Sequence, residues 1–234
     1  MRRPLVVFSA AALVAVAFSA LAFAPRSASA AGTVTSTGSG ASASASFFAD
    51  IGGVQTSTFV FASDHSFSDP SGTFEGSDVF VDIFQFDPGN PRNPRDDKFH
   101  SFSGYAELPS GQFQVADDLS SATLSAVVNV CEFEGKQPPP QPNCFDVTVD
   151  LSWAGTGVVQ TFSGKSNSRF DGCKVHSTFS GSFRSASATG TVSDGTTNFT
   201  PNPSDFADMS TFSFKDTFIG DCFFPEPPPP EPVG

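Results

Sequence analysis

The segment VNVCEFEGKQPPPQPNCFDVTVDLSW (128–153) contains two alternating stretches on either side of a proline-rich break. In residues 145–153, the odd-numbered positions are apolar and the even-numbered ones are Asp, Thr, Asp and Ser. A period of two is typical of a β-strand that buries one face. The segment therefore predicts a β-hairpin whose return strand carries Trp153 into the core.

Cys131 and Cys144 stand where the two strands of this hairpin would part. A zinc site would need cysteine pairs two to four residues apart, and a redox site a C-x-x-C motif, neither of which occurs. We therefore expect a Cys131–Cys144 disulfide, which would stabilise the hairpin by about 3 kcal/mol. Cys173 and Cys222 would then pair by default, with the other two connectivities left open.

Alternation recurs along the chain, at 54–61, 77–86, 122–130, 174–183 and 210–219. In 77–86 both faces are apolar, with Phe on one side and Val and Ile on the other, which predicts a strand in the middle of the structure or between two sheets. Turn-rich clusters separate these segments, at 68–72, 87–97, 136–143, 193–195 and 200–205. The pattern predicts an all-β fold, an antiparallel β-sandwich or partly open barrel of about 9–10 strands stapled by disulfides.

The chain divides into four parts. Residues 1–30 have the layout of a signal peptide, with Arg2 and Arg3 before an apolar run that ends in Ala-Ser-Ala. Residues 31–46 are rich in small side chains and are either a strand or a flexible segment. Residues 47–224 are expected to form a single β domain, and 225–234 a proline-rich tail.

The charge of the chain limits its partners. The net charge is −12, and removing residues 1–30 takes away three arginines and no acid, which leaves −15. Such a chain repels nucleic acid and anionic membranes, and no later apolar run is long enough to span a bilayer. Four cysteines after an export signal predict a secreted protein with disulfides, whose partner would be an extracellular protein or a glycan.

The candidate catalytic groups are weakly marked. His65, His100 and His176 could each serve a hydrolase, but no G-x-S-x-G elbow singles out a serine, and His176 is expected to face solvent. Glu132 and Glu134 flank Phe133 and could form a carboxylate pair, although a charged edge that discourages sheet association is the simpler interpretation. No catalytic residue is therefore assigned.

Calcium is the cofactor that the sequence leaves open. Loop aspartates provide hard oxygen ligands, namely Asp87 with Asp96 and Asp97, and Asp205 with Asp208. No D-x-D-x-D-G spacing occurs, so solvated loop acids are the default interpretation and no metal ligand is assigned.

The aromatic balance is unusual, with 28 Phe against one Tyr, Tyr105, and one Trp, Trp153. Sugar-binding surfaces favour aromatic rings with a polar handle, so this balance argues against a carbohydrate-binding module.

Residues 119–205 resemble a group of exported bacterial all-β proteins that have no assigned function. The resemblance is carried by V-x-V-D-L-x-W-x-G-x-G, here Val147 to Gly157, and by R-x-A-x-A-x-G-x-V, here Arg184 to Val192. It implies an exported all-β domain and brings no catalytic residues.

These observations favour an exported, non-enzymatic binding or structural protein of the cell envelope or extracellular space. The alternatives are an extracellular hydrolase with a carboxylate pair or a serine nucleophile, and an inhibitor or partner-binding protein that presents a proline-rich loop to its partner.

Overall fold

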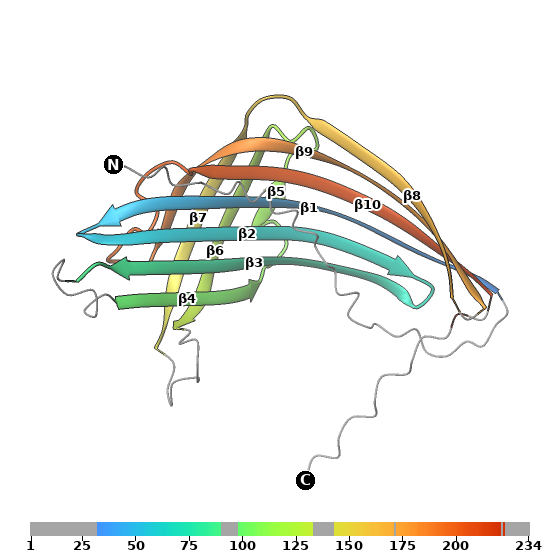
Figure 1. The fold of residues 1–234 in the computed structure, drawn as a ribbon, viewed down its shortest axis with the longest axis horizontal. Coiled ribbons are helices and arrows are strands. Elements are labelled where there is room, and N and C mark those ends of the chain that lie inside the picture. The colour runs from blue at the N-terminus through green and yellow to red at the C-terminus, as the bar shows by residue number, and fades with distance from the viewer. Residues whose placement is uncertain (1–31, 90–97, 133–142, 171, 221, 223–234) are drawn as a thin grey trace, which may run out of the picture.

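The computed structural model describes residues 32–89, 98–132, 143–170, 172–220 and 222, and these form strands joined by turns and loops (Figure 1). The strands are β1 (Gly32–Ile51), β2 (Val54–Asp69), β3 (Gly72–Asp87), β4 (Lys98–Glu107), β5 (Phe113–Val115), β6 (Ser121–Glu132), β7 (Cys144–Gly155), β8 (Gln160–Phe170), β9 (Cys173–Ser193) and β10 (Phe206–Gly220). The predicted signal peptide and proline-rich tail lie outside the described residues.

All the pairings between these strands are antiparallel. The order is β10-β1-β2-β3-β4-β6-β7-β9-β8, and β10 also pairs with β9, so the ladder returns to its start. The prediction of an all-β, antiparallel, disulfide-stapled fold is confirmed. The sequence leaves a sandwich and a partly open barrel as alternatives, and the hydrogen bonding forms a single ring-like sheet. Strands β7 and β8 pair with successive parts of the same edge of β9.

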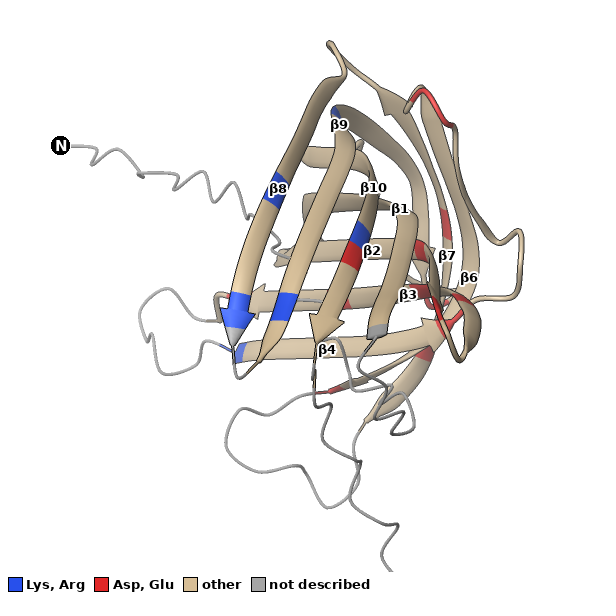
Figure 2. Ribbon diagram, turned by 90° about the vertical axis from the view of Figure 1, so that its right-hand side faces the viewer, with Lys and Arg blue, Asp and Glu red and all other residues tan. Residues whose placement is uncertain are grey.

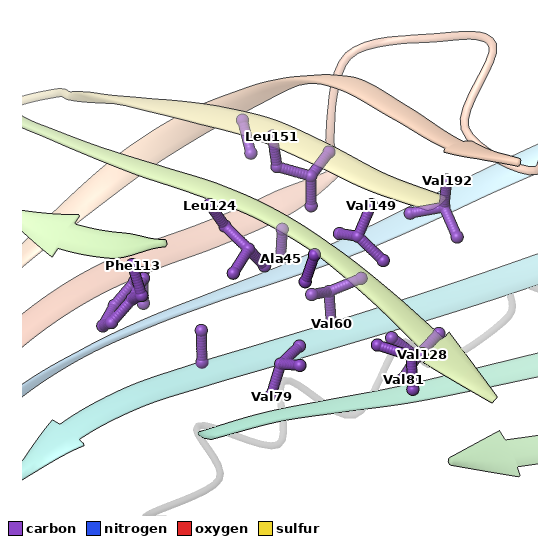
Figure 3. Close-up of a cluster of buried hydrophobic side chains, with 14 of the residues drawn as sticks. Ala45, Val60, Val79, Val81, Phe113, Leu124, Val128, Val149, Leu151 and Val192 are labelled. Carbon is purple, nitrogen blue, oxygen red and sulfur yellow. The ribbon is translucent and has the colours of Figure 1, made fainter. Parts of the chain in front are cut away.

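The core lies where β6 and β7 cross the inner face of β1, β2 and β3 (Figures 1 and 3). Every second residue of β6 and β7 is buried, as the alternation predicts. Trp153 is 2% exposed, and its Nε1 donates a hydrogen bond of 2.8 Å to the carbonyl oxygen of Ser44 on β1. Its predicted place in the core is confirmed.

One expectation about β3 is wrong. Val79, Val81 and Ile83 are buried, but Phe80 and Phe84 on the opposite side are 37% and 40% exposed. The strand is central in the sheet, yet no second sheet covers its outer face among the described residues, because the sheet closes on itself and encloses only one face of each strand.

The small-residue segment 31–46 is expected from its sequence to be either a strand or flexible. It falls largely in β1 and is therefore a strand. Ala43 and Ala45 are fully or almost fully buried in the core, in the same cluster as Trp153 and as Val60, which pairs with Ala45 from β2. A strand of small residues has a weak local preference, and here its pairing with β2 and β10 on both edges supplies the stabilisation.

Both predicted disulfides are present. Cys131 and Cys144 close the mouth of the β6–β7 hairpin, as the last pair of its ladder, with a Cα–Cα distance of 4.0 Å. Cys173 and Cys222 join the start of β9 to the second residue after β10, with a Cα–Cα distance of 4.7 Å.

Six strands extend beyond the core and curve away from it (Figure 1). We call this extension the wing, and its inner face is the one continuous with the core. Along β1 the buried residues change face there: Ala43, Ala45 and Phe47 are buried inside the ring, whereas Ser36 and Gly38 are buried at outer-face positions. The wing comprises β8 and residues 173–183 of β9, 210–220 of β10, 32–42 of β1, 63–69 of β2 and 72–78 of β3.

Candidate functional site

His65 lies on the outer face beside Ser63 and Asp78, the three residue types of a hydrolytic triad. The Ser63 hydroxyl donates to Asp78 Oδ1 at 3.1 Å, and His65 Nδ1 is 3.8 Å from Asp78 Oδ2. In a triad the histidine stands between the serine and the carboxylate, so that it can take the hydroxyl proton. Here the carboxylate stands in the middle, so the arrangement does not activate Ser63.

His100 forms the closest histidine–carboxylate contact of the described residues, with 2.7 Å between its Nδ1 and Glu132 Oε1. The pair lies at the end of β6 beside the Cys131–Cys144 bond, and the imidazole stacks on Phe102. It joins β4 to β6 where the ladder between these strands has only two residue pairs. From this position we infer that the His100–Glu132 pair stabilises the short contact between β4 and β6.

The remaining predicted candidates do not converge. His176 is exposed, as expected, and its ring contacts Asn167 of β8. Glu134, Asp96 and Asp97 lie outside the described residues, as does the proline-rich loop 136–143 except for its last residue. Asp205 accepts a hydrogen bond from the Phe48 amide, while Asp208 bonds Ser44. Within the described part of the chain, no three His, Cys, Asp or Glu side chains are grouped to hold a metal ion.

A shallow groove lies on the wing across β8, β9 and β10. It consists of two adjoining hollows of about 350 and 530 Å³ that share Ser163, Ser180 and Ser213. Each hollow is lined by three consecutive residues of each strand, so two of the three rows in each hollow belong to one face of the sheet. That face is the inner one, since these rows share the face of the buried Met209.

Hydroxyl groups dominate the sides of this groove. In strand-to-strand register the rows are Thr161, Ser182 and Thr211; Ser163, Ser180 and Ser213; and Lys165, Thr178 and Lys215. The Ser180 and Ser213 hydroxyls are 2.9 Å apart and the Thr178 hydroxyl donates to the Lys215 carbonyl, yet each side chain keeps further hydrogen-bonding capacity.

Four cations stand on the same face. Lys165 and Lys215 flank Thr178 in one row, and Arg169 and Lys174 pair four residues further along (Figure 2). All four are exposed, and none forms an ion pair with a described carboxylate. No acidic side chain lies on the inner face of these three wing strands within the described residues.

The sequence interpretation missed these cations, although a signal was present. The segments QTFSGKSNSRF (160–170) and CKVHSTFSGSF (173–183) together contain three Lys or Arg residues and no acid, in a chain with twice as many acids as bases. Neither segment alone says that the two sets of charges share a face, because that depends on the register between β8 and β9.

Three aspartates on the outer face have raised pKa values. Burial raises the pKa of Asp78, Asp82 and Asp208, and hydrogen bonds from Ser63, Ser101 and Ser44, respectively, oppose the shift in part. The ordinary pKa of an aspartate, which applies to the unfolded chain, is 3.8. Between this pH and the raised pKa of the folded state, the native protein binds more protons than the unfolded chain. Each group therefore lowers the stability of the fold as the pH rises through that interval.

The Asp208→Asn variant tests this sign. At neutral pH the wild type must bury this carboxyl group in its charged form, and the substitution removes that cost. The melting temperature of the variant minus that of the wild type is therefore expected to be larger at about pH 7 than at about pH 3. Thermal unfolding followed by circular dichroism across this range measures it. Asp64→Asn, at an exposed position of β2, is the control. If the melting temperature of the variant minus that of the wild type decreased as the pH rises, this would contradict a raised pKa of Asp208.

No protein-family model matches this chain, and no curated protein matches it. Among solved structures, it is similar to an acetoacetate decarboxylase-like enzyme from Sphingomonas wittichii RW1, at 6% identity over 82% of this chain and 92% of that chain, with a TM-score of 0.27. Nothing about this chain follows from a superposition of that quality.

Two further observations concern the environment of the protein. Two disulfides, with no free cysteine among the described residues, indicate an oxidising compartment. No helix in the described part of the chain is long and apolar enough to cross a membrane.

Proposed function

We propose that the protein is a secreted, non-enzymatic binding protein, and that the wing groove holds an extended acidic polysaccharide. The observation that supports this most directly is the set of four cations, without ion pairs to described carboxylates, on the inner face of three wing strands that carry no described acid there, in a chain of net charge −12. Cations gathered on one face of an acidic protein create a local attraction for anionic groups.

The dimensions of the groove favour a polymer. From the row of Thr161 to the row of Arg169 the strands extend about 27 Å, at about 3.4 Å per residue. Cations occupy two rows about 14 Å apart, and the one inner-face row between them consists of Asn167, His176 and Thr217. The rows of hydroxyl groups lie on the other side of the Lys165 row. A ligand with spaced carboxylate or sulfate groups and many hydroxyls matches both features.

The acids of the protein do not cancel this attraction. The inner-face carboxylates of the wing closest to the groove belong to Asp64 on β2 and Glu75 on β3, about 10 and 14 Å from β10 by strand spacing. Salt screens charges over about 8 Å at physiological ionic strength, so the groove cations dominate the field at their own rows.

The test is calorimetric titration of the secreted protein with alginate, a uronic-acid polymer, and with neutral dextran. We expect alginate to bind and the Lys165→Gln/Lys215→Gln double variant to bind it about tenfold more weakly, a loss of about 1.4 kcal/mol. Affinity should fall as salt is added.

Lys98→Gln is the matched control, since Lys98 is an exposed inner-face lysine on β4, outside the wing. Equal binding of dextran and alginate, or a double variant that binds alginate like the wild type, would refute the proposal. The resemblance to the exported bacterial group remains a prediction that agrees with it.

A further inference from the structure

The outer face of the wing carries aromatic rings in register across six strands. One row consists of Gly164, Phe179, Phe214, Gly38, Phe67 and Phe74, and the adjacent row of Phe162, Gly181, Phe212, Gly40, His65 and Gly76. Glycine and aromatic residues are thus neighbours within both rows.

The rings cover the glycines. A Cβ placed on Gly38 would lie 2.3 Å from the ring of Phe214, and one on Gly164 equally close to the ring of Phe179. The ring of Phe162 covers Gly181 in the same way. A side chain at these positions would displace the rings, so glycine here permits an aromatic layer to lie across the neighbouring strands.

This layer is open to solvent. Phe162 and Phe179 are 48% and 46% exposed, and Phe74 is 40% exposed. A contiguous exposed apolar surface of this kind, on a protein that must stay soluble after export, is typical of an interaction site.

The charges on the outer face are of one sign. The six Lys and Arg residues of the described chain all lie on the inner face, namely Lys98, Lys165, Arg169, Lys174, Arg184 and Lys215. On the wing's outer face, Asp216 lies two residues from Phe214 on the side away from the core, and Asp78 follows Gly76 on the core side. Carboxylates therefore border the aromatic rows, and no Lys or Arg of the described strands accompanies them.

We propose that the outer face of the wing docks a basic polypeptide segment, with its guanidinium or ammonium groups placed over the phenylalanine rings and beside Asp216 and Asp78. Ring faces attract cations, and Arg is the cation most often found over them. An anionic lipid surface would be repelled by the same carboxylates. A second copy docked through the same face would bring like charges together.

The experiment titrates fluorescently labelled nona-arginine into the secreted protein and follows anisotropy, with nona-glutamate as the opposite-charge probe. The test variant is Phe162→Leu/Phe179→Leu, which keeps apolar side chains but removes the rings. The control is Phe99→Leu/Phe206→Leu, since both of these residues are 64% exposed and lie on the outer face outside the wing. We expect the wing variant to bind nona-arginine at least about fivefold more weakly and the control to stay within about twofold of the wild type.

Asp216→Asn is the second variant, which keeps both rings, and it should weaken the same interaction. The Lys165→Gln/Lys215→Gln variant should bind nona-arginine like the wild type, so this proposal and the polysaccharide proposal can fail separately. If the wing and control variants weakened nona-arginine binding equally, the binding would reflect only the general attraction of a cation to an acidic protein, and the inference would be overturned. A dimer of the wild type that is lost in the wing variant would overturn it in favour of a second copy.

Discussion

Replacing Trp153 with alanine is expected to lower the free energy of unfolding by about 4 kcal/mol. The indole is among the largest fully buried side chains, and its Nε1–H bond to Ser44 ties β7 to β1 across the interior of the ring. The substitution would leave a cavity and remove a hydrogen bond between strands that do not pair directly in the sheet. Urea unfolding followed by far-UV circular dichroism measures the loss.

Two further variants divide this effect. Trp153→Phe keeps an aromatic ring but not the donor, so it should lose less, about 1–2 kcal/mol. Val127→Ala is the control, because Val127 is 61% exposed on β6 and its truncation should change the stability by less than about 0.5 kcal/mol. A Trp153→Ala variant as stable as Val127→Ala would show that the indole does not pack between β7 and β1.

Removing the Cys173–Cys222 bond is expected to destabilise the fold by about 4 kcal/mol, and removing Cys131–Cys144 by about 3 kcal/mol. The sequence separations are 49 and 13 residues, and the longer loop restricts the unfolded chain more. Paired Cys→Ala variants in urea give the two values, with alanine chosen because Cys173 is 1% exposed and a buried hydroxyl would add its own penalty.

Adding a reductant provides the internal control for this prediction. Reduced wild-type protein should lose about the combined effect of the two bonds, and each paired variant only the effect of its remaining bond. Variants that unfold at the same urea concentration as the wild type, with or without reductant, would contradict the stabilising role of both disulfides.

Several elements could be predicted because their signal is local. The alternation in 145–153 predicts β7 and the burial of Trp153, and the spacing of Cys131 and Cys144 around a proline-rich break predicts their bond. The strands β4, β5 and β8 were not predicted, since Ser, Gly and Lys interrupt the pattern of β4 and β8 and β5 is only three residues long. Their pairing partners, and not their own propensities, make them strands.

The candidate sites were not predictable for a related reason. The sequence shows that many residues are Phe, Ser or Gly, but these types recur along β1 and β10 without a period that marks one face as inner. Only the register sorts them: Gly38 pairs with Phe214 and Phe67, which places it beneath a ring on the outer face. The same register gathers Lys165 and Lys215 on the inner face.

The sequence by itself determined that the chain is all-β, is stapled by two disulfides and buries the apolar face of β7 with Trp153, because alternation and cysteine spacing act within a strand or a hairpin. The tertiary structure decided which face of each wing strand looks inward and where the charges gather. That choice depends on ring closure, in which β1 near the start of the described chain pairs with β10 near its end, as Gly32 does with Gly220. A one-residue shift in any of these long-range pairings would move each side chain of the strand to the other face, and no local pattern fixes it.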